Sequence, residues 1–410
     1  LSLPDLALAV DLGSGGSILY GDEATLDDVI WTGPRPSLAE LAGLAGLDGT
    51  RPRLALAGDA GGASRLFFTP PYRAEHREEL AGILGCPPRG TEAAASLDLI
   101  RAVVALREIK ESAEIDRMDE AADIAAGMHR AVIARARPGL RESELASLAA
   151  GIAHSSGAAP AFTVIATVRG SVLHNHDRSG VLADGDLFLL DAGAETADGY
   201  AADLTTTFPV NGRFDARQRE VYEIVLAAHR AACSTLTPGV HFRETHFAAA
   251  REIFAGLKAL GLARGDTEEA LAAGAHALFF PHGVGHQIGL DAHDMESLGE
   301  IYVGYDGEPK SPQFGLRSLR MAKALKPGMT VTVEPGVYFI APLAARWKAE
   351  GLHRGFLDYA EIEKWLPVGG VRNEEDWVIT ESGARKLGVS FDKSAAVLEA
   401  AVGSEWKDGA

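Results

Sequence analysis

Two carboxylates follow each other closely in a strongly apolar stretch, LFLLDAGAETADGYAADLTTTF, at residues 187–208. Asp191 ends the apolar run 187–190, and Asp203 comes 12 residues later (203 − 191 = 12), inside a second strand-like segment. That separation is long enough for a hairpin to return and set the two side chains beside each other. Carboxylates at the ends of buried strands repel each other and resist desolvation, so we expect a cation between them.

Three histidines lie close together in a later stretch, FFPHGVGHQIGLDAHD, at residues 279–294. His282, His286 and His293 are separated by glycines, which let the backbone approach a ligand closely. No glutamate follows His282, so the helical HExxH zinc motif is excluded. A solvated loop would explain His293 taken alone.

Two glutamates also lie in strand-like segments. Glu334 closes the alternating strand of MTVTVEPGVYF before a Pro-Gly turn, and Glu374 lies in GGVRNEEDWVIT. The two-residue period of a strand puts Arg372 and Glu374 on one face, where a plain salt bridge would satisfy both. Asp191 alone would be a turn acceptor, and Glu334 alone an edge-strand charge. Five such coincidences in one domain favour a shared site.

These side chains fit a site for two metal ions, formed by Asp191, Asp203, His286, Glu334 and Glu374. Its four carboxylates carry a formal charge of −4, which two divalent cations neutralise. Bridging carboxylates hold such a pair of cations about 3.5–4 Å apart and trap a hydroxide between them. An oxygen-rich ligand set with one nitrogen favours Mn²⁺, with Co²⁺ or Zn²⁺ as substitutes.

Several helices and strands must position these residues. Apolar residues at helical spacing between Ile115 and Val132 predict a helix that stops at Pro138. Strand-like segments include residues 161–168, and strand and loop are expected beyond Phe280. Three further helices are predicted: residues 142–155, the segment from the N-cap Asp215 to about 235, and about 242–262.

The sequence pattern changes near residue 105, where a long helical stretch begins. This change predicts two domains, a small N-terminal α/β domain at 1–105 and a larger α+β domain at 106–410. In the first, apolar runs at 6–10 and 54–57 alternate with turn clusters and Ala/Leu-rich helical patches. The glycine cluster at 13–16 predicts a hairpin turn rather than a phosphate loop, since no Lys-Ser/Thr follows it.

Composition narrows the classes of function. The 410 residues are 47% hydrophobic, which suffices for a large core. Lys and Arg number 39 against 57 Asp and Glu, and the net charge of −18 argues against nucleic acid and anionic membranes as partners. Cys86 and Cys233 are too few for a disulfide framework or a thiolate metal cage. With no membrane-length apolar run and no basic signal-peptide start, we expect a soluble cytoplasmic protein.

The order of these motifs resembles a known family. D-x11-D, H-G-x-G-H…H-D, T-V-E-P-G and G-x-R-x-E, spread over about residues 106–392, resemble the pita-bread metallopeptidases: methionine aminopeptidase, aminopeptidase P and prolidase. FGLRSLRMAKALKPGMTVTVEPGVYFI, GGVRNEEDWVITESG, SVLHNHD and YAADLTTTFPVNGRF are similar to prolidase, the Xaa-Pro dipeptidase. The resemblance implies an α+β pita-bread catalytic domain at 106–410 behind a creatinase-like N-terminal domain, and a homodimer.

The resemblance also implies a role for each matching residue. Asp191 and Asp203 bind one metal, with Asp203 bridging. His286 and Glu334 bind the other, and Glu374 bridges both.

The same resemblance implies the substrate-binding and catalytic groups. His174, His282 and His293 line the substrate site. Arg320, 14 residues before Glu334 (334 − 320 = 14), matches the arginine that holds the terminal carboxylate of the substrate. The catalytic group is then Glu334, His293 and His282, in which His293 stabilises the oxyanion and Glu334 relays a proton. A solvated surface arginine is the alternative for Arg320.

Three positions depart from the family pattern. Thr206 replaces an arginine, Asn175 a tyrosine, and Asn373 an apolar residue. None removes a ligand, but each could change the support of the ligands or the shape of the pocket.

The expected activity is hydrolysis of Xaa-Pro bonds in dipeptides by a metal-bridging hydroxide. Aminopeptidase P activity on longer proline-containing peptides is the alternative. Creatinase-like hydrolysis without metal and a non-catalytic binding protein of the same fold are disfavoured by the intact ligand set. Methionine aminopeptidase lacks the N-terminal domain and the context of Arg320.

Overall fold

The structure, a computed structural model, describes residues 5–389 and 391–404. The chain divides into two compact units, Leu1–Ala102 and Val103–Ala410. The assignment of residues 1–105 as a creatinase-like domain and 106–410 as the catalytic domain stays a prediction.

The first unit contains a three-stranded sheet in the order β1-β2-β3. The glycine cluster turns the chain between β1 (Ala7–Val10) and β2 (Ser17–Gly21), which pair antiparallel as the hairpin prediction requires. The run 54–57 begins a helix, because Ala and Leu are strong helix formers. The remaining elements of this unit are β3 (Gly49–Pro52), α1 (Leu26–Thr32), α2 (Leu38–Leu44), α3 (Ala55–Gly61), α4 (Ala74–Leu84) and η1 (Pro88–Gly90), and helix α5 (Leu97–Arg107) begins in the first unit and ends in the second.

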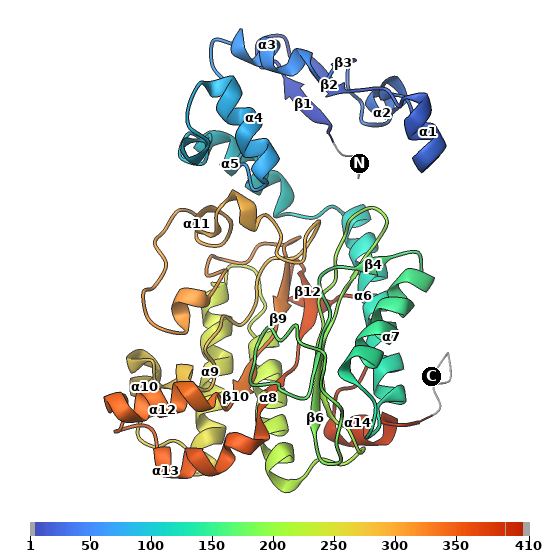
Figure 1. Ribbon diagram of the computed structural model, residues 1–410. Helices are drawn as coiled ribbons and strands as arrows, with labels where there is room; N and C mark the ends of the chain where they lie inside the picture. Colours follow the sequence, from blue (N-terminus) through green and yellow to red (C-terminus); the bar gives the residue numbers. More distant parts are fainter. Residues whose placement is uncertain (1–4, 390, 405–410) are drawn as a thin grey trace. The chain divides into compact units, whose positions relative to one another are not determined.

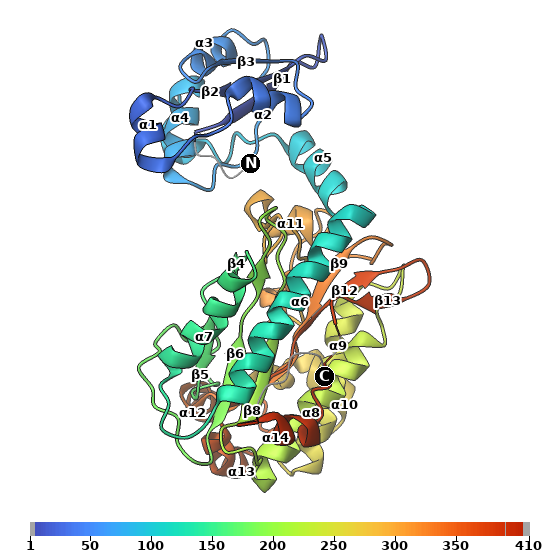
Figure 2. The same cartoon turned by 90° about the vertical axis from the view of Figure 1, so that its right-hand side faces the viewer.

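Four long helices of the second unit match the predicted ones: α6 (Ser112–Arg135), α7 (Glu142–Ser155), α8 (Ala216–Cys233) and α9 (Phe242–Ala259). Asp215 caps α8 by accepting a hydrogen bond from the Gln218 amide, as its position predicted. The helices pack as two pairs, α6 with α7 and α8 with α9, and strands lie between the pairs (Figures 1 and 2).

The strands form several small sheets. One has the order β5-β6-β8 and another β13-β12-β9, while β10 pairs with β11 and β4 with β7. Helix α7 packs on β4 and β5, and α8 packs on β9, β10 and β11. The strands are β4 (Ala159–Pro160), β5 (Ile165–Thr167), β6 (Leu187–Asp191), β7 (Ala194–Glu195), β8 (Thr205–Pro209), β9 (Thr330–Val333), β10 (Gly336–Tyr338), β11 (Gly370–Arg372), β12 (Glu375–Ile379) and β13 (Ala384–Lys386).

Short helices that the sequence did not predict lie around and beyond Phe280. Most of them span too few turns for an apolar periodicity to show, so the expectation of strand and loop alone was wrong there. They are α10 (Thr267–Ala273), η2 (Ala275–Leu278), η3 (Glu296–Leu298), α11 (Glu300–Val303), η4 (Leu316–Ser318), α12 (Ala341–Glu350), α13 (Tyr359–Ile362), η5 (Glu363–Val368) and α14 (Ala395–Ala401).

Strand register brings the acidic segments together. The chain returns from β6 to β8 as the spacing predicted, and Asp191 pairs with Thr205. Thr205 also bridges to Glu374, so the β6–β8 hairpin adjoins the segment that enters β12. Gln287 bridges to Val331 of β9, which carries the histidine loop to the same place.

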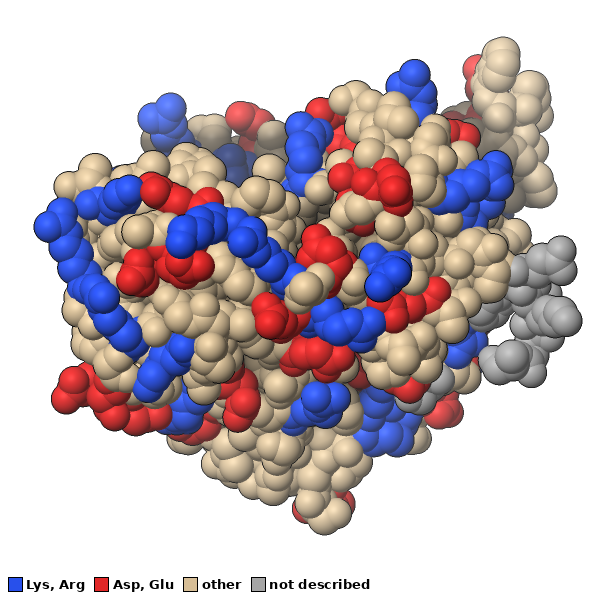
Figure 3. All heavy atoms as spheres, turned by 90° about the horizontal axis from the view of Figure 1, so that it is seen from below, with Lys and Arg blue, Asp and Glu red and all other residues tan. Residues whose placement is uncertain are grey.

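Charge on the surface is mixed. Acidic and basic side chains are interspersed over the face in Figure 3, and its described side chains form no continuous basic field. Among the described helices, none has the length and apolarity needed to cross a bilayer.

The hairpin of Asp191 and Asp203 depends on a close backbone approach at Gly193. A Cβ at this position would lie 1.7 Å from the carbonyl oxygen of Ala202. We expect Gly193→Ala to lower the free energy of unfolding by about 3 kcal/mol, measured by urea denaturation, because the hairpin must open to admit the methyl group. Gly151→Ala, on an open face of α7, should instead stabilise by about 0.5–1 kcal/mol. Equal stability of the two variants would contradict the close approach.

Candidate metal centre

Four of the predicted metal ligands converge. Asp203, His286 and Glu374 each offer a ligand atom, and these atoms lie within 4.8 Å of one another. His286 Nε2 lies 3.6 Å from Asp203 Oδ2 and 3.8 Å from Glu334 Oε1. Asp203, His286 and Glu374 are buried, and Glu334 is partly exposed. The β6–β8 hairpin, the histidine loop and the ends of β9 and β11 thus meet at one point.

Asp191 joins this group through Arg372. The Arg372 guanidinium donates from Nη2 to Asp191 Oδ2 at 2.5 Å and from Nε to Thr205 Oγ1 at 3.0 Å. Thr205 in turn donates to Glu374 Oε2 at 2.7 Å. Arg372 is therefore connected to Glu374 by hydrogen bonds through Thr205. A direct salt bridge between Arg372 and Glu374, the simpler expectation, does not account for these contacts.

His286 is oriented with one nitrogen facing the acids. Its Nδ1 lies 2.9 Å from the carbonyl oxygen of Gln287, so Nδ1 carries the hydrogen and donates it. That assignment leaves a lone pair on Nε2, the nitrogen beside Asp203 and Glu334. Backbone pairing holds the residue in place, because Thr332 N donates to the His286 carbonyl at 2.9 Å. An imidazole fixed in this way is pre-arranged as a metal ligand.

Burial makes the acids hard to ionise together. Desolvation, together with the charge of Asp191, raises the pKa of Glu334 to about 7 although Arg372 opposes the shift. Desolvation and neighbouring carboxylates also raise the pKa of Asp203 and of Glu374 well above the ordinary range. Desolvation lowers the pKa of His286 to about 3, so this imidazole is neutral at pH 7. Added positive charge is what would allow all these carboxylates to be ionised.

Two buried carboxylate oxygens without hydrogen-bond partners support the binding of a cation at this position. Asp191 Oδ1 and Asp203 Oδ1 have no hydrogen-bond partner among the described residues, although buried polar atoms normally have one. The available donors are carboxylate oxygens and one imidazole nitrogen, a set that suits divalent cations. Asp191, Asp203, His286, Glu334 and Glu374 therefore fit the predicted metals, although their role as ligands stays a prediction.

Asp203 and Glu374 also contact residues that were not predicted from the sequence. Asp203 N donates to Asp376 Oδ2 at 2.8 Å, and burial raises the pKa of Asp376 to about 8. Lys393 Nζ donates to the backbone carbonyls of Glu374 at 2.7 Å and Thr205 at 3.0 Å. In the sequence, the only indication for Asp376 was that it follows Glu374 by two residues and so shares its face of the strand. No local sequence pattern pointed to Lys393.

His282 lies on the other side of Glu334. Its Nδ1 is 2.7 Å from the Gly283 carbonyl and 3.7 Å from Glu334 Oε2, and its Nε2 is 2.9 Å from the Tyr338 hydroxyl. Tyr338 also accepts from Arg372 Nη1 at 3.0 Å. This tyrosine was missed, although it follows Glu334 by four residues (338 − 334 = 4) and so keeps the two-residue period. It links His282 to the arginine that holds Asp191.

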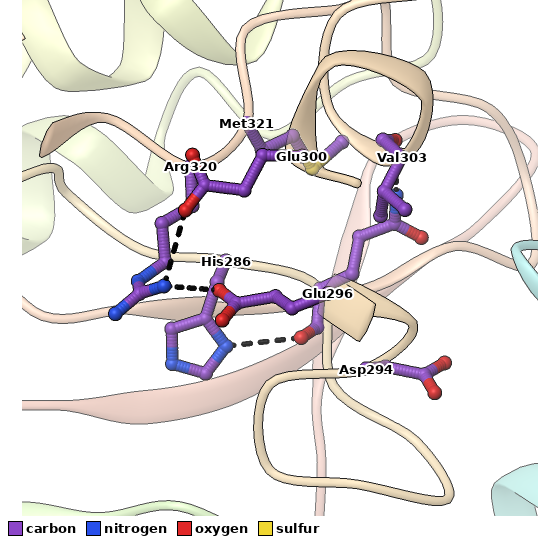
Figure 4. A pocket seen from close by; sticks show the side chains of 8 residues that line it. His286, Asp294, Glu296, Glu300, Val303, Arg320 and Met321 are labelled. Atoms are coloured by element: carbon purple, nitrogen blue, oxygen red, sulfur yellow. Dashed lines mark hydrogen bonds and ion pairs between the residues drawn. The ribbon is translucent and has the colours of Figure 1, made fainter. Parts of the chain in front are cut away.

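Arg320 and His286 line one pocket (Figure 4), and His293 contacts His286. The His293 ring packs edge-on against His286 at 4.3 Å between centroids. Arg320 Nη1 lies 2.5 Å from Glu296 Oε1 and 3.3 Å from Glu300 Oε1, and both glutamates point toward it (Figure 4). Glu296 Oε2 is also 3.3 Å from His293 Nδ1. Arg320 is therefore partly exposed and paired with two glutamates, neither of which was anticipated from the sequence.

His174 is exposed but lies within electrostatic reach of the site. Its pKa is lowered by desolvation and by the charge of Arg372, while Asp191 opposes the shift. A role of His174 in binding substrate stays a prediction.

Two of the three departures from the family pattern have structural accounts. Thr206 is buried, with Oγ1 3.0 Å from His129 Nδ1, and so joins β8 to α6. Asn175 Nδ2 donates to Thr167 Oγ1 at 2.8 Å. Asn373 is buried, and both its side-chain polar atoms lack a hydrogen-bond partner among the described residues, which nothing else in the structure explains.

The raised pKa of Glu334 predicts how stability varies with pH after chelation. Its pKa moves from 4.5 to about 7 on folding, so the folded metal-free protein retains a proton that the unfolded chain has released. The contribution of this carboxyl to stability should therefore fall as the pH rises from 4.5 through 7. Between pH 6.5 and 7.5 it should lower the free energy of unfolding by about 0.7 kcal/mol. The buried histidines, whose pKa values are lowered, add an opposing slope, so the contribution is measured by urea denaturation as the difference between wild type and Glu334→Gln.

Two comparisons check that prediction. Glu334→Gln should lack this decrease, because the variant has no carboxyl to titrate at this position. Saturation with Mn²⁺ should also remove the decrease, because the cation stabilises the ionised form. Equal pH slopes of the chelated wild type and the chelated Glu334→Gln variant would contradict the electrostatic account.

Known proteins resemble this chain along most of its length. The family model for metallopeptidase family M24 matches residues 116–381. A probable Xaa-Pro aminopeptidase of Fusarium vanettenii is 31% identical over 398 residues, which cover 95% of this chain and 82% of the relative. The Xaa-Pro dipeptidase of Homo sapiens is 35% identical over 295 residues, which cover 70% of this chain and 58% of the relative.

A solved structure extends the similarity to the fold. Aminopeptidase PepP of Pseudomonas aeruginosa matches with a TM-score of 0.79 and 30% sequence identity, covering 97% of this chain and 86% of that chain. The predicted α+β pita-bread fold is thereby confirmed, and the chain belongs to metallopeptidase family M24.

Proposed function

We propose that this protein is a metal-dependent exopeptidase that hydrolyses Xaa-Pro bonds, with Xaa-Pro dipeptides as its first candidate substrates. The observation that carries the proposal is the convergence of ligand atoms of Asp203, His286 and Glu374 within 4.8 Å, beside a pocket that contains an arginine. Similar proteins named Xaa-Pro aminopeptidase and Xaa-Pro dipeptidase support the same bond specificity.

Two divalent cations would be held by Asp191, Asp203, His286, Glu334 and Glu374. When bound, they would supply a water-derived nucleophile at neutral pH and polarise the scissile carbonyl. Mn²⁺ is the first candidate, with Co²⁺ or Zn²⁺ as substitutes, because oxygen ligands dominate the set. Arg372 and Thr205 orient Asp191 and Glu374 through one oxygen each.

The side chains around this centre divide the remaining work. Glu334, between His282 and His286, would carry a proton from the nucleophile to the proline nitrogen as the bond breaks. His293, packed against His286, would stabilise the negative charge on the carbonyl oxygen. Arg320, His174 and His282 would cover the proline and its carboxylate.

Aminopeptidase P activity on longer peptides is the second candidate. Two observations favour it. The relatives that match this chain over most of their own length include a probable Xaa-Pro aminopeptidase, and Arg320 is already paired with Glu296 and Glu300.

We also infer a cytoplasmic location and a homodimer. Both cysteines of the chain are free, and burial raises the pKa of Cys233 well above its usual value, which suits a reducing compartment. The homodimer follows from the family resemblance alone.

Metal reconstitution tests the proposed activity. Mn²⁺ added to the chelated protein should restore hydrolysis of Gly-Pro and Ala-Pro, followed by release of proline. Asp203→Ala and Glu374→Ala should each reduce kcat/KM by at least about 10³-fold, because each removes a carboxylate from the centre. Glu268→Gln, at an exposed pair with Arg251, should leave the activity unchanged. Full activity in either ligand variant would refute the proposed centre.

Arg320→Ala separates the two candidate activities. If Arg320 binds the terminal carboxylate of a dipeptide, the variant should lose about 10²-fold in kcat/KM for Ala-Pro and much less for Ala-Pro-Ala, whose carboxylate lies one residue further on. Equal losses on the two substrates would favour aminopeptidase P. The thermal midpoint of the variant serves as the control for folding, since the change also leaves two glutamates without this partner.

A further inference from the structure

One carboxylate of the protein contacts both Arg320, which is proposed to hold the substrate carboxylate, and His293, which is proposed to stabilise the oxyanion. Glu296 Oε1 lies 2.5 Å from Arg320 Nη1, and its other oxygen lies 3.3 Å from His293 Nδ1 (Figure 4 shows the contact with Arg320). A carboxylate has two acceptor oxygens in one plane, and here each contacts a different donor. Glu296 contacts Nη1 of Arg320, so a dipeptide carboxylate that bound this nitrogen would have to displace Glu296, and one that bound the other guanidinium nitrogens would lie close to its negative charge.

The backbone holds Glu296 in this position firmly. Met295, the preceding residue, is buried and has a positive φ of 64°, which is uncommon for a side chain of this type. Asp294 is buried as well, and its carboxylate accepts from Lys110 at 2.7 Å and from Arg107. The start of η3 is therefore fixed, and the Glu296 side chain projects from it into the pocket.

Arg320 has a second partner that remains when Glu296 is displaced. Glu300 Oε1 lies 3.3 Å from Arg320 Nη1, and Glu300 is itself paired with Lys310. The Glu296 and Arg320 side chains are 25% and 32% exposed, so their ion pair is partly solvated and replaceable. Exchange of Glu296 for another carboxylate thus leaves the arginine supported on one side.

We propose that Glu296 acts as an internal competitor that occupies Arg320 and His293 in the free enzyme and weakens the preference for substrates with a free carboxylate next to the scissile bond. The inference rests on the proposed Xaa-Pro activity and deepens it. The displaced carboxylate also stays close to the pocket, where its charge repels the incoming one. The substrate class then widens from free dipeptides toward Xaa-Pro units whose proline carboxylate is blocked or extended.

Glu296→Gln tests this role with a change of charge and almost none of shape. For Mn²⁺-loaded enzyme, the KM for Ala-Pro should fall about 5- to 10-fold, while the KM for Ala-Pro-amide should change less than 2-fold, because the amide carries no competing charge. Glu296→Asp keeps the charge and should leave the ratio of the two KM values near that of wild type. Glu268→Gln, at an exposed glutamate–arginine pair, is the matched control.

Opposite results would overturn the proposal. A rise in KM for Ala-Pro in Glu296→Gln would make Glu296 a support that positions Arg320 for substrate, and equal changes for acid and amide would make its role purely structural. kcat can change through the contact with His293, so only the KM ratio decides.

A binding measurement keeps this test separate from the proposed activity. By titration calorimetry on the Mn²⁺-loaded proteins, L-proline should bind Glu296→Gln about 5- to 10-fold more tightly than wild type, and L-prolinamide equally. If wild type hydrolyses no Xaa-Pro substrate, the proposed activity fails, yet proline and prolinamide still report on Glu296. Unchanged proline affinity in the variant would refute the internal competitor.

Discussion

Repulsion among four carboxylates in a desolvated interior is the constraint on which the rest of the structure depends. The protein supports these acids without neutralising them. Arg372 engages one oxygen of Asp191, and Thr205 engages one oxygen of Glu374. Asp191 Oδ1 and Asp203 Oδ1 stay without partners among the described residues. A buried charge that is left uncompensated strongly destabilises a fold, so these acids either keep protons, as their raised pKa values indicate, or are ionised together beside positive charge from outside the chain.

Much of the centre could be predicted because its signals are local. The apolar run before Asp191 and the distance to Asp203 specify a hairpin, and the Pro-Gly pair after Glu334 marks the end of a strand. Long helices were equally readable, since α6 and α8 each span several turns of one apolar stripe. Their register and packing then follow from burial of that stripe.

The parts that escaped prediction depend on contacts between distant residues. Tyr338, Asp376 and Lys393 acquire their roles only when separate strands meet. The short helices beyond Phe280 are too brief to leave a periodic trace, and one of them, η3, decides where Glu296 lies. Anion binding by Arg320 stays a prediction, and its pairing with Glu296 and Glu300 depends on how the intervening loop folds back. Local sequence patterns thus located the candidate metal-site residues better than the residues that surround and support them.

The predicted ligands come from segments that are far apart in the chain, since Asp203, His286 and Glu374 lie on the β6–β8 hairpin, the histidine loop and the segment entering β12. An ion bound among them would therefore cross-link these segments and stabilise the fold, in addition to taking part in the reaction. A related protein in which one ligand had been replaced would therefore lose tertiary stability as well as activity. An inactive relative would then need other contacts between the same segments, such as apolar packing or a new ion pair, to keep the fold stable.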